Sequence, residues 1–346
     1  MREEEAFRAL EGAGLRPARV AVGYGATYRV YVEGDETLAD VSGRLRHAAR
    51  TRRDLPAVGD WVAVRWTPPE RATIQAILPR RSLFSRKTAG RETTEQILAA
   101  NVDTAFLVAG LDHDFNPRRI ERYLAMTRAS GASPVIVLNK ADLAPDLAAQ
   151  RAAVEAVASG APVHAISSKL GEGLEALEPY LRPGETVALL GSSGVGKSTI
   201  INRLLGTERQ RTAEVRASDQ RGRHTTTYRE LVRLPGGALL IDTPGMRELQ
   251  LWDASEGVQE TFDDIARIAA GCHFADCRHD TEPRCAVKAA VADGRLAADR
   301  LAAWQKLQAE ETSLAARKDV LARDATKKKW RTIHRAVRRM PPKGSS

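Results

Sequence analysis

The residues from Gly191 to Ser198 have the spacing of a phosphate-binding loop. They follow the pattern G-x-x-x-x-G-K-S, with an apolar run (186–190) before them and a helix-forming stretch after them. The glycines allow backbone N–H groups to close around phosphate oxygens at a helix N-terminus, where the helix dipole favours anions. An ordinary glycine-rich turn does not need a Lys-Ser pair in this context. We therefore predict that Lys197 reaches the outer phosphates of a nucleotide and assists catalysis, and that the Ser198 hydroxyl binds Mg²⁺. The predicted nucleotide contacts of the loop are Gly191, Ser192, Ser193, Gly194, Val195, Gly196, Lys197, Ser198 and Thr199.

A carboxylate follows another apolar run further along the chain. Asp242 comes after Leu239-Leu-Ile and begins the sequence Asp-Thr-Pro-Gly, which ends at Gly245. Phosphoryl transfer needs a carboxylate for Mg²⁺ close to the phosphate loop, and the carboxyl end of a strand is a suitable place for it. We predict that Asp242 supplies this carboxylate and that the backbone N–H of Gly245 contacts the γ-phosphate.

Two polar segments indicate which base is bound. The segment Asn139-Lys-Ala-Asp142 follows an apolar run, and the Asp142 carboxylate can accept from N1–H and N2–H₂ of guanine, a donor pair that adenine lacks. Lys140 would lie over the purine, and Asn139 would tie this loop to its neighbours. A second segment (167–169) follows the next apolar run and would offer backbone N–H groups to guanine O6. With the phosphate loop, these segments favour GTP over ATP. The predicted base contacts are Asn139, Lys140, Asp142, Ser167, Ser168 and Lys169.

All three cysteines of the chain lie within fourteen residues, which favours a metal site over disulfides. Together with His279 they supply three thiolates and one imidazole, the complete tetrahedral set of a structural Zn²⁺ site. His273 is an alternative fourth ligand, but it is adjacent to Cys272 and would strain the chelate. The segment is too short and polar to bury a core, so we expect the metal to hold it together. The predicted zinc ligands are Cys272, Cys277, His279 and Cys285.

The elements that position these residues follow from the hydrophobic pattern. From about residue 100 onwards, buried apolar runs alternate with helix-forming stretches, which predicts an α/β domain whose parallel sheet is covered on both faces. The expected strands are 102–108, 134–138, 163–166, 186–190 and 239–241, and the expected helices are 118–129, 148–158 and 197–205.

The two ends of the chain have different patterns. Four short alternating or β-branched runs between residues 18 and 80 favour a five-stranded oligonucleotide-binding (OB) barrel. A loop at 44–53 carries six basic residues that could contact RNA phosphates, and a solvated loop is the alternative. Past Gly245 we expect helices at 258–269 and from about 295, the latter with an apolar stripe of Leu296, Leu301, Trp304 and Leu307. The expected strands of the barrel are 19–23, 27–32, 60–64 and 72–77. The expected domains are an OB-like barrel (1–88), a GTPase domain (89–250) and a zinc-binding domain with a basic tail (251–346).

Composition excludes several classes of protein. Apolar residues make up 43 % of the 346, which is enough for real cores and excludes wholesale disorder. No run approaches the ~20 apolar residues of a membrane span, and the charged start is unlike a signal peptide, so we expect a cytoplasmic protein without a membrane partner. The net charge of +9 lies in residues 317–346, which hold eleven Lys/Arg and two Asp/Glu. Such a tail suits a polyanion, and a solvated extension is the alternative.

These motifs together resemble the circularly permuted GTPases, because the base-binding segments precede the phosphate loop and Asp242-Thr-Pro-Gly245. With a barrel before them and a Cys/His cluster after them, they resemble in particular the small-subunit-dependent GTPases of bacterial ribosome biogenesis. The resemblance extends over nearly the whole chain, including Ala100-Asn-Val-Asp103 and Gly222-Arg-His-Thr-Thr226. It implies a GTPase that binds the small ribosomal subunit and its rRNA, acts in late maturation of the subunit, and is stimulated by it, with GTP hydrolysis timing release.

The catalytic residues depart from those of many small GTPases. Where a glutamine often orients the attacking water, Gly245 is followed by Met246, which cannot do so. His224, which the family resemblance also indicates, is the candidate to hold the water, although an exposed loop histidine is the alternative. Thr226, or its neighbour Thr225, is expected to bind Mg²⁺ and the γ-phosphate.

Two other functions fit parts of this pattern. A P-loop ATPase or kinase is disfavoured by Asn139-Lys-Ala-Asp142, and nucleotide competition would separate it from a GTPase. A non-catalytic RNA-binding module switched by GTP is favoured by the missing glutamine but disfavoured by Asp242 and the threonines. We expect a Mg²⁺-dependent GTP hydrolase with one structural zinc that acts as a monomer.

Overall fold

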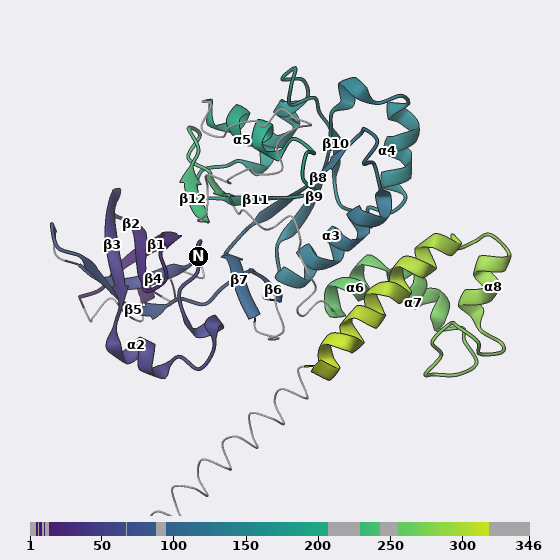
Figure 1. The fold of residues 1–346 in the computed structure, drawn as a ribbon, viewed down its shortest axis with the longest axis horizontal. Helices are drawn as coiled ribbons and strands as arrows, with labels where there is room; N and C mark the ends of the chain where they lie inside the picture. Colours follow the sequence, from purple (N-terminus) through teal and green to yellow (C-terminus); the bar gives the residue numbers. More distant parts are fainter. Residues whose placement is uncertain are drawn as a thin grey trace, which may run out of the picture.

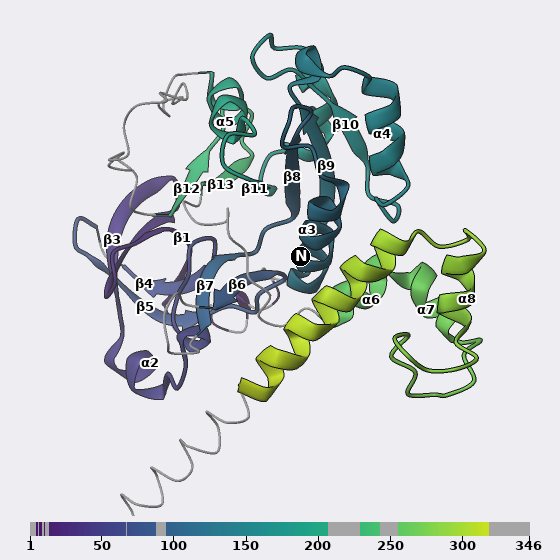
Figure 2. The ribbon, with the colours of Figure 1, turned by 45° about the vertical axis from the view of Figure 1, so that its right-hand side comes forward.

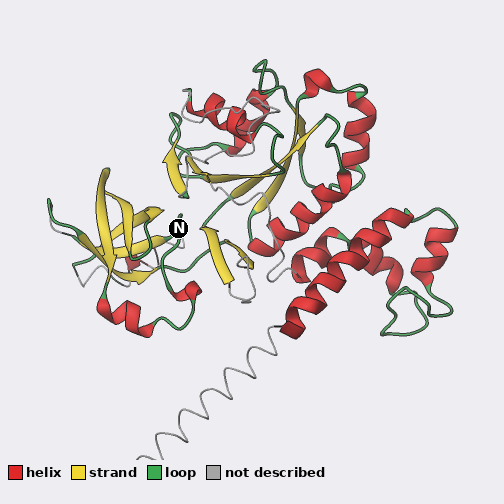
Figure 3. Ribbon diagram, in the orientation of Figure 1, coloured by secondary structure: helices red, strands yellow, loops and turns green. Residues whose placement is uncertain are grey.

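The computed structural model describes residues 14–66, 68–87, 95–206, 229–242 and 255–317, together with positions 5, 7, 8 and 10. In this part of the chain, a barrel, a central α/β domain and a C-terminal helical domain follow one another (Figure 1; Figure 3). The strands are β1 (Arg16–Gly23), β2 (Thr27–Val32), β3 (Asp35–Val41), β4 (Trp61–Arg65), β5 (Ala72–Ile77), β6 (Leu83–Lys87), β7 (Glu95–Ala100), β8 (Thr104–Gly110), β9 (Ser133–Asn139), β10 (Val163–Ala165), β11 (Thr186–Leu190), β12 (Glu230–Arg233) and β13 (Leu239–Asp242). The α-helices are α2 (Gly43–Ala48), α3 (Pro117–Ser130), α4 (Leu147–Glu155), α5 (Lys197–Leu205), α6 (Ser255–Thr261), α7 (Asp263–Ala269), α8 (Ala286–Ala292) and a helix at 298–317.

Strands β1 to β5 close into the five-stranded barrel that the sequence predicts. Their order is β1-β2-β3-β5-β4, and β4 pairs again with β1. Inward-facing small and β-branched side chains, such as Val20, Val30, Val62 and Ile74, fill the interior. The alternating apolar pattern predicts every strand of the barrel except β3, which pairs antiparallel with β2 and parallel with β5.

The basic segment 44–53 is partly helical, which corrects the expectation of a loop. Helix α2 begins after Ser42, whose hydroxyl accepts from the N–H of Leu45 (3.2 Å), and a 3-10 helix, Arg52–Asp54, follows. The six basic side chains of the segment are exposed, and Arg53 forms an ion pair with Glu95 (2.8 Å). The short helices therefore present most of these cations on one exposed stretch of chain.

The central sheet is parallel and covered on both faces, as predicted. Strands β10, β9, β8, β11 and β13 are neighbours and all run in the same direction. Alternate side chains of β8 and β9 pack to opposite sides: Leu107 and Ile136 contact the core that α3 and α4 cover, and Phe106 and Val135 belong to the core beneath α5. Two layers of helices thus surround the strands that carry the nucleotide motifs.

Strand β12 was not expected from the sequence, and it joins the two sheets. It pairs antiparallel with β13 on one side and with β1 on the other, so the barrel and the central domain share one continuous sheet of eleven strands. The remaining two strands, β6 and β7, form a separate antiparallel pair.

The C-terminal helices pack against α3. The expected helix 258–269 is two helices, α6 and α7, which meet at Phe262. Helix α6 comes very close to α3, since a Cβ at Gly257 would lie 2.0 Å from the Ala125 carbonyl oxygen. The helix at 298–317 runs alongside α6 (Figure 2), and its predicted stripe is buried at Leu301 and Leu307 and partly buried at Trp304. In the part of the chain that the structure describes, no helix combines the length and apolar character needed to cross a membrane.

Candidate nucleotide site and metal centre

The predicted phosphate loop connects β11 to α5 and depends on its glycines. Gly191 has φ 151°, and a Cβ there would lie 2.3 Å from the Val108 carbonyl oxygen. Gly196 has φ 97° and N-caps α5, and a Cβ there would lie 2.2 Å from Nδ2 of Asn139. Ser193 and Gly194 are exposed at the tip, and Val195 is buried beneath them. The loop thus opens at the start of a helix whose first turn has no acidic residue, which favours a bound anion.

The cationic side chain of the loop lies against its backbone. Lys197 Nζ donates to the carbonyl oxygens of Gly191 (2.7 Å) and Ser192. Ser198 and Thr199 follow in the first turn of α5, where their backbone N–H groups have no intrahelical acceptor. The ammonium and the helix N-terminus therefore lie at the same end of the loop, as the chemistry of phosphate binding requires.

Asn139 joins the three predicted nucleotide segments. Its side chain is buried at the end of β9, where its Nδ2 donates to the Val195 carbonyl oxygen (2.8 Å) and its Oδ1 accepts from the N–H of Ser168 (3.0 Å). Asn139 is expected to tie its loop to neighbouring ones, and the structure shows that these are the loops containing Val195 and Ser168. One amide side chain therefore holds the phosphate loop and both base-binding segments together.

The carboxylate expected to bind guanine is exposed and oriented by a serine. Asp142 lies in a 3-10 helix, Ala141–Leu143, and its Oδ1 accepts from the Ser167 hydroxyl (2.5 Å). The Ser167 backbone N–H donates to the Glu172 carbonyl oxygen (3.0 Å), and the carbonyl groups of Ser168 and Lys169 accept from Arg203 of α5. The Ser167 hydroxyl thus joins the two base-binding segments, and Arg203 ties the second of them to α5.

The structure adds Asp112, which belongs to no sequence motif, to the candidate base site. Lys140 has a left-handed backbone (φ 66°), and its Nζ forms an ion pair with the Asp112 carboxylate (2.5 Å) after β8. Partial burial is the largest single influence and opposes the charged form of Asp112, but the bonds from Lys140 and from the Asp114 N–H together outweigh it and hold the pKa of that carboxyl below its usual value. Asp112 thereby fixes the direction of the Lys140 side chain. The two residues are 28 positions apart, so no local pattern pairs them.

The remaining predicted catalytic residues are only partly described. The backbone of Asp242 ends β13, which pairs with β11 in parallel register (Ala188 with Ile241), so Asp242 lies at the sheet edge where the phosphate loop begins. Its side chain, and the residues His224, Thr225, Thr226 and Gly245, lie outside the described residues, as does the basic tail after Arg317.

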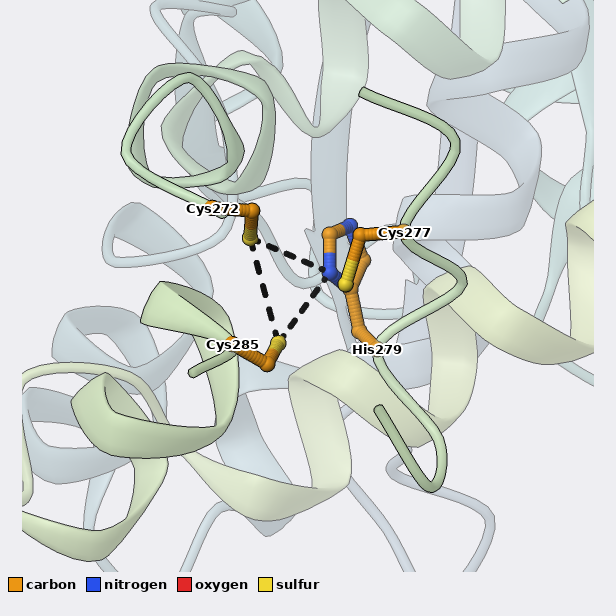
Figure 4. Close-up of side chains that lie close together, drawn as sticks. All are labelled: Cys272, Cys277, His279 and Cys285. Carbon is orange, nitrogen blue, oxygen red and sulfur yellow. Dashed lines mark hydrogen bonds between the residues drawn. The ribbon is translucent and has the colours of Figure 1, made fainter. Parts of the chain in front are cut away.

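The structure brings the four predicted metal ligands into one cluster. The donor atoms of Cys272, Cys277, His279 and Cys285 all lie within 4.8 Å of one another (Figure 4). The distance between Cys272 Sγ and Cys285 Sγ is 3.9 Å, and His279 Nδ1 lies 3.6 and 3.4 Å from these two sulfurs. Tetrahedral Zn²⁺ with its usual bond lengths places two sulfurs about 3.8 Å apart, and sulfur and nitrogen about 3.5 Å apart. The distances among Cys272, His279 and Cys285 therefore match those of a tetrahedral site, and Cys277 completes a donor set whose chemistry suits such an ion.

Neighbouring residues hold this cluster in shape. His279 is buried with φ 61°, and its ring packs against that of Trp304 (centroids 5.4 Å apart). The Glu282 carboxylate accepts from the N–H groups of Arg278 and Asp280 (2.9 Å each), and these bonds lower its pKa to about 2. His273, the alternative ligand, is not part of the group of four, and its ring lies edge-on against Phe274.

Comparison with known protein families shows which family the chain belongs to. Residues 77–252 match the family described as RsgA GTPase, which is just over half of the sequence. The chain belongs to the RsgA GTPase family. The matched range contains all of the predicted nucleotide motifs in their permuted order, from Asn139 to Gly245.

The relatives of this RsgA GTPase cover the flanking domains as well. It is 51 % identical over 343 residues to the small ribosomal subunit biogenesis GTPase RsgA of Opitutus terrae, covering 96 % of this chain and 94 % of that protein. It is 45 % identical to the protein of the same name from Syntrophotalea carbinolica, covering 97 % and 94 %. Among solved structures, YjeQ from Thermotoga maritima is similar at TM-score 0.63 and 27 % identity, covering 85 % and 97 %. YloQ, described as a circularly permuted GTPase, has the same fold at TM-score 0.59 and 23 % identity, covering 88 % and 96 %.

Proposed function

We propose that this RsgA GTPase binds and hydrolyses GTP and acts in the biogenesis of the small ribosomal subunit. The observation that carries the proposal is the position of Asn139, which holds the phosphate loop and the two base-binding segments in one site. The names of the relatives at 51 % and 45 % identity support the biological setting, because they extend over nearly the whole chain.

The described residues supply most of a nucleotide site. The backbone of the phosphate loop and Lys197 bind the phosphates, and the Asp142 carboxylate accepts from the guanine edge. Mg²⁺, bound by the Ser198 hydroxyl with Asp242 and Thr226, would neutralise charge that develops between the outer phosphates during transfer. Lys140, held by Asp112, would pack over the purine. We infer that GTP is preferred over ATP because adenine offers no donor pair to Asp142.

Hydrolysis needs a group that positions water, and the chain offers His224 for this role. Met246 stands after Gly245 where a glutamine often serves, and a thioether does not orient water. We expect His224→Ala to keep GTP affinity and to lose most of the turnover that the ribosomal subunit stimulates, measured as phosphate release at saturating GTP. Unchanged turnover would remove His224 from the mechanism.

RNA and zinc complete the proposal. The exposed basic side chains of 44–53 in the barrel and the basic tail would contact rRNA of the small subunit by binding its phosphates. The cluster of three cysteines and His279 would hold one zinc ion in a structural role, since all four tetrahedral positions are filled by protein. We infer that the protein acts in the cytoplasm as a monomer.

The deciding experiment is GTP turnover with and without purified small ribosomal subunits at moderate salt. We expect strong stimulation, together with competition by GDP and none by ATP. Tight GTP binding without stimulation would instead support a non-catalytic switch. Efficient competition by ATP would contradict guanine specificity.

A further inference from the structure

The second residue of the phosphate loop is held by helix α3. Arg119, in the first turn of α3, donates from Nη1 to the Ser192 hydroxyl (2.5 Å) and to the Asp114 carboxylate (2.5 Å). The Asp114 carboxylate and the Tyr123 hydroxyl also lie close to Ser192. Arg119 and Ser192 are 73 positions apart in the sequence, so this cluster of four side chains is made by the fold alone.

Arg119 joins the serine hydroxyl to a carboxylate. The Ser192 hydroxyl and the Asp114 carboxylate both accept from the same guanidinium nitrogen of Arg119. The bond from Arg119 holds the pKa of the Asp114 carboxyl below its usual value, and the same bond raises the pKa of Arg119. Both groups are therefore charged at neutral pH, and charge-assisted bonds of this kind are the stronger ones.

The backbone of Ser192 connects this cluster to the phosphate-binding lysine. The Ser192 carbonyl oxygen accepts from Lys197 Nζ, and its hydroxyl is held by α3. The tip of the loop beyond it, at Ser193 and Gly194, is exposed. Ser192 is thus the point at which helix α3 holds the loop, next to its exposed tip.

We propose that Arg119 is a positioning residue that holds the phosphate loop, through Ser192, in the shape that binds the phosphates. The proposal rests on the proposed function, because it assumes that the loop binds GTP and GDP. A preformed loop loses less conformational freedom when the nucleotide binds. The loop amides surround the phosphates that GDP and GTP have in common, so Arg119 acts on the affinity for both nucleotides equally and not on the chemical step.

The test is a double-mutant cycle in the full-length protein. The variants are Arg119→Ala, Ser192→Ala and the two combined, with Arg119→Lys as the conservative replacement. Arg122→Ala is the matched control, because Arg122 lies on the same helix but forms an ion pair with Glu310. For each variant, the dissociation constants of fluorescent GDP and of a non-hydrolysable GTP analogue are measured, with kcat and KM of the subunit-stimulated reaction and the melting temperature.

We expect Arg119→Ala to weaken the binding of GDP and of the GTP analogue by the same factor, about three- to tenfold. KM should rise with kcat unchanged, Arg119→Lys should restore part of the affinity, and Arg122→Ala should bind like the wild type. The combined variant should bind nucleotide no more weakly than the single variant with the lower affinity, because the two substitutions remove the same contact.

Three results would overturn the proposal. Additive losses in the combined variant would mean that Arg119 does not act through Ser192. A loss confined to the GTP analogue with a lower kcat would assign Arg119 to the γ-phosphate. Unchanged affinity in both Arg119→Ala and Ser192→Ala would show that the cluster has no effect on the loop. A wild-type protein that binds neither nucleotide would refute the proposed function itself, whereas the other results leave it standing.

Discussion

At the scale of single residues, Asp142 is the residue that we propose to select the base. Its carboxylate is exposed, and one of its oxygens already accepts from the Ser167 hydroxyl, which fixes its direction. The guanine edge presents two donors, and an ionised carboxylate is acceptor only. The match therefore depends on the carboxylate group and not on its size.

We predict that Asp142→Asn changes the base that is bound. The asparagine amide would place a donor against guanine N1–H or N2–H₂, so GTP affinity should fall by at least about tenfold. Xanthosine triphosphate, which has an acceptor oxygen in place of the 2-amino group, should bind better to the variant than to the wild type. Competition titration of GTP and of xanthosine triphosphate against fluorescent GDP measures both changes in affinity. Equal losses for the two nucleotides would show that Asp142 has only a structural role.

At the scale of elements, α3 is shared by two domains. One side of its first turns holds the phosphate loop through Arg119, and another contacts the C-terminal helices. Glu121 is fully buried, and its Oε1 accepts from Arg118 (2.8 Å) and from Arg300. Arg300 also forms two bonds of 2.7 Å with Asp264, and its guanidinium lies 4.9 Å from the centre of the Phe262 ring. Burial raises the pKa of Glu121, although the two arginines favour its charged form.

We predict that Glu121→Ala destabilises the attachment of the C-terminal helices. Removing one partner of a buried ion pair costs about 3–5 kcal/mol when the other is left uncompensated, and the cost here should be nearer 2–3 kcal/mol because Arg300 keeps Asp264. The matched control is Glu155→Ala, which removes an exposed pair with Arg151 and should cost less than about 0.5 kcal/mol. Urea unfolding of the full chain measures both variants, and equal midpoints would contradict the argument.

The metal cluster is the second element whose stability can be tested. The segment 272–285 has two short helices beside it, and Cys285 accepts through Sγ from the N–H of Lys288 at the start of α8. Only His279 and Cys285 of this segment are buried, so we expect bonds to a metal ion to fix the loop between Cys272 and Cys285.

Removing the metal by chelation should therefore expose this segment to proteases. We expect one equivalent of zinc in the purified protein, and cleavage within 272–285 after chelation that zinc addition reverses. His279→Ala should lower the zinc content, whereas His273→Ala should leave it unchanged. Resistance to proteolysis after complete metal loss would show that packing alone holds the segment.

The elements also show what the sequence could and could not predict. Strands β8, β9, β11 and β13 and helix α5 were predicted within two residues, because continuous apolar runs and the phosphate loop define them. Strand β3 was missed because only Ala39 and Val41 of its seven residues are buried, so its pattern is mostly polar. Helix α2 was missed for the same reason, since none of its residues is buried. The contacts of Asp112 and Arg119 were missed because they join segments far apart in the chain.

At the scale of the whole molecule, a junction around Asn101 holds the barrel and the central domain together, in addition to the pairing of β1 with β12. Arg19 of β1 is buried over the Trp61 ring and donates from Nη2 to the Asn101 carbonyl oxygen (3.1 Å) and the Thr186 hydroxyl (2.9 Å). Asn101 donates from Nδ2 to the Gly59 carbonyl oxygen (3.1 Å). The Asp103 carboxylate accepts from the Thr186 N–H (2.8 Å). The segment Ala100-Asn-Val-Asp103, noted in the sequence only through a family resemblance, is thus the joint between two domains.

Gly59 lets the barrel come very close to the backbone of Ala100 at this junction. Its φ is 88°, and a Cβ there would lie 2.1 Å from the Ala100 carbonyl oxygen and 3.0 Å from Ile241 of β13. Its N–H donates to the Val20 carbonyl oxygen of the barrel (2.9 Å), so the turn at Gly59 cannot move away without breaking barrel contacts. Gly25 has nearly the same backbone, φ 86°, but a Cβ there would meet nothing within 4 Å.

Substituting these two glycines distinguishes the stability cost of a strained backbone from the cost of disturbing the contact between the domains. Gly25→Ala should cost about 1–2 kcal/mol, the penalty of a left-handed alanine. Gly59→Ala adds a clash with a backbone carbonyl, so we expect it to cost about 3 kcal/mol or more. Urea unfolding of both variants, followed by circular dichroism, compares them. Because the barrel and the central domain share one sheet through β1 and β12, the loss in Gly59→Ala should also weaken guanine-nucleotide binding, measured with fluorescent GDP. Equal unfolding midpoints for the two variants would mean that the joint yields without cost, and that the barrel and the central domain are stable independently of their contact.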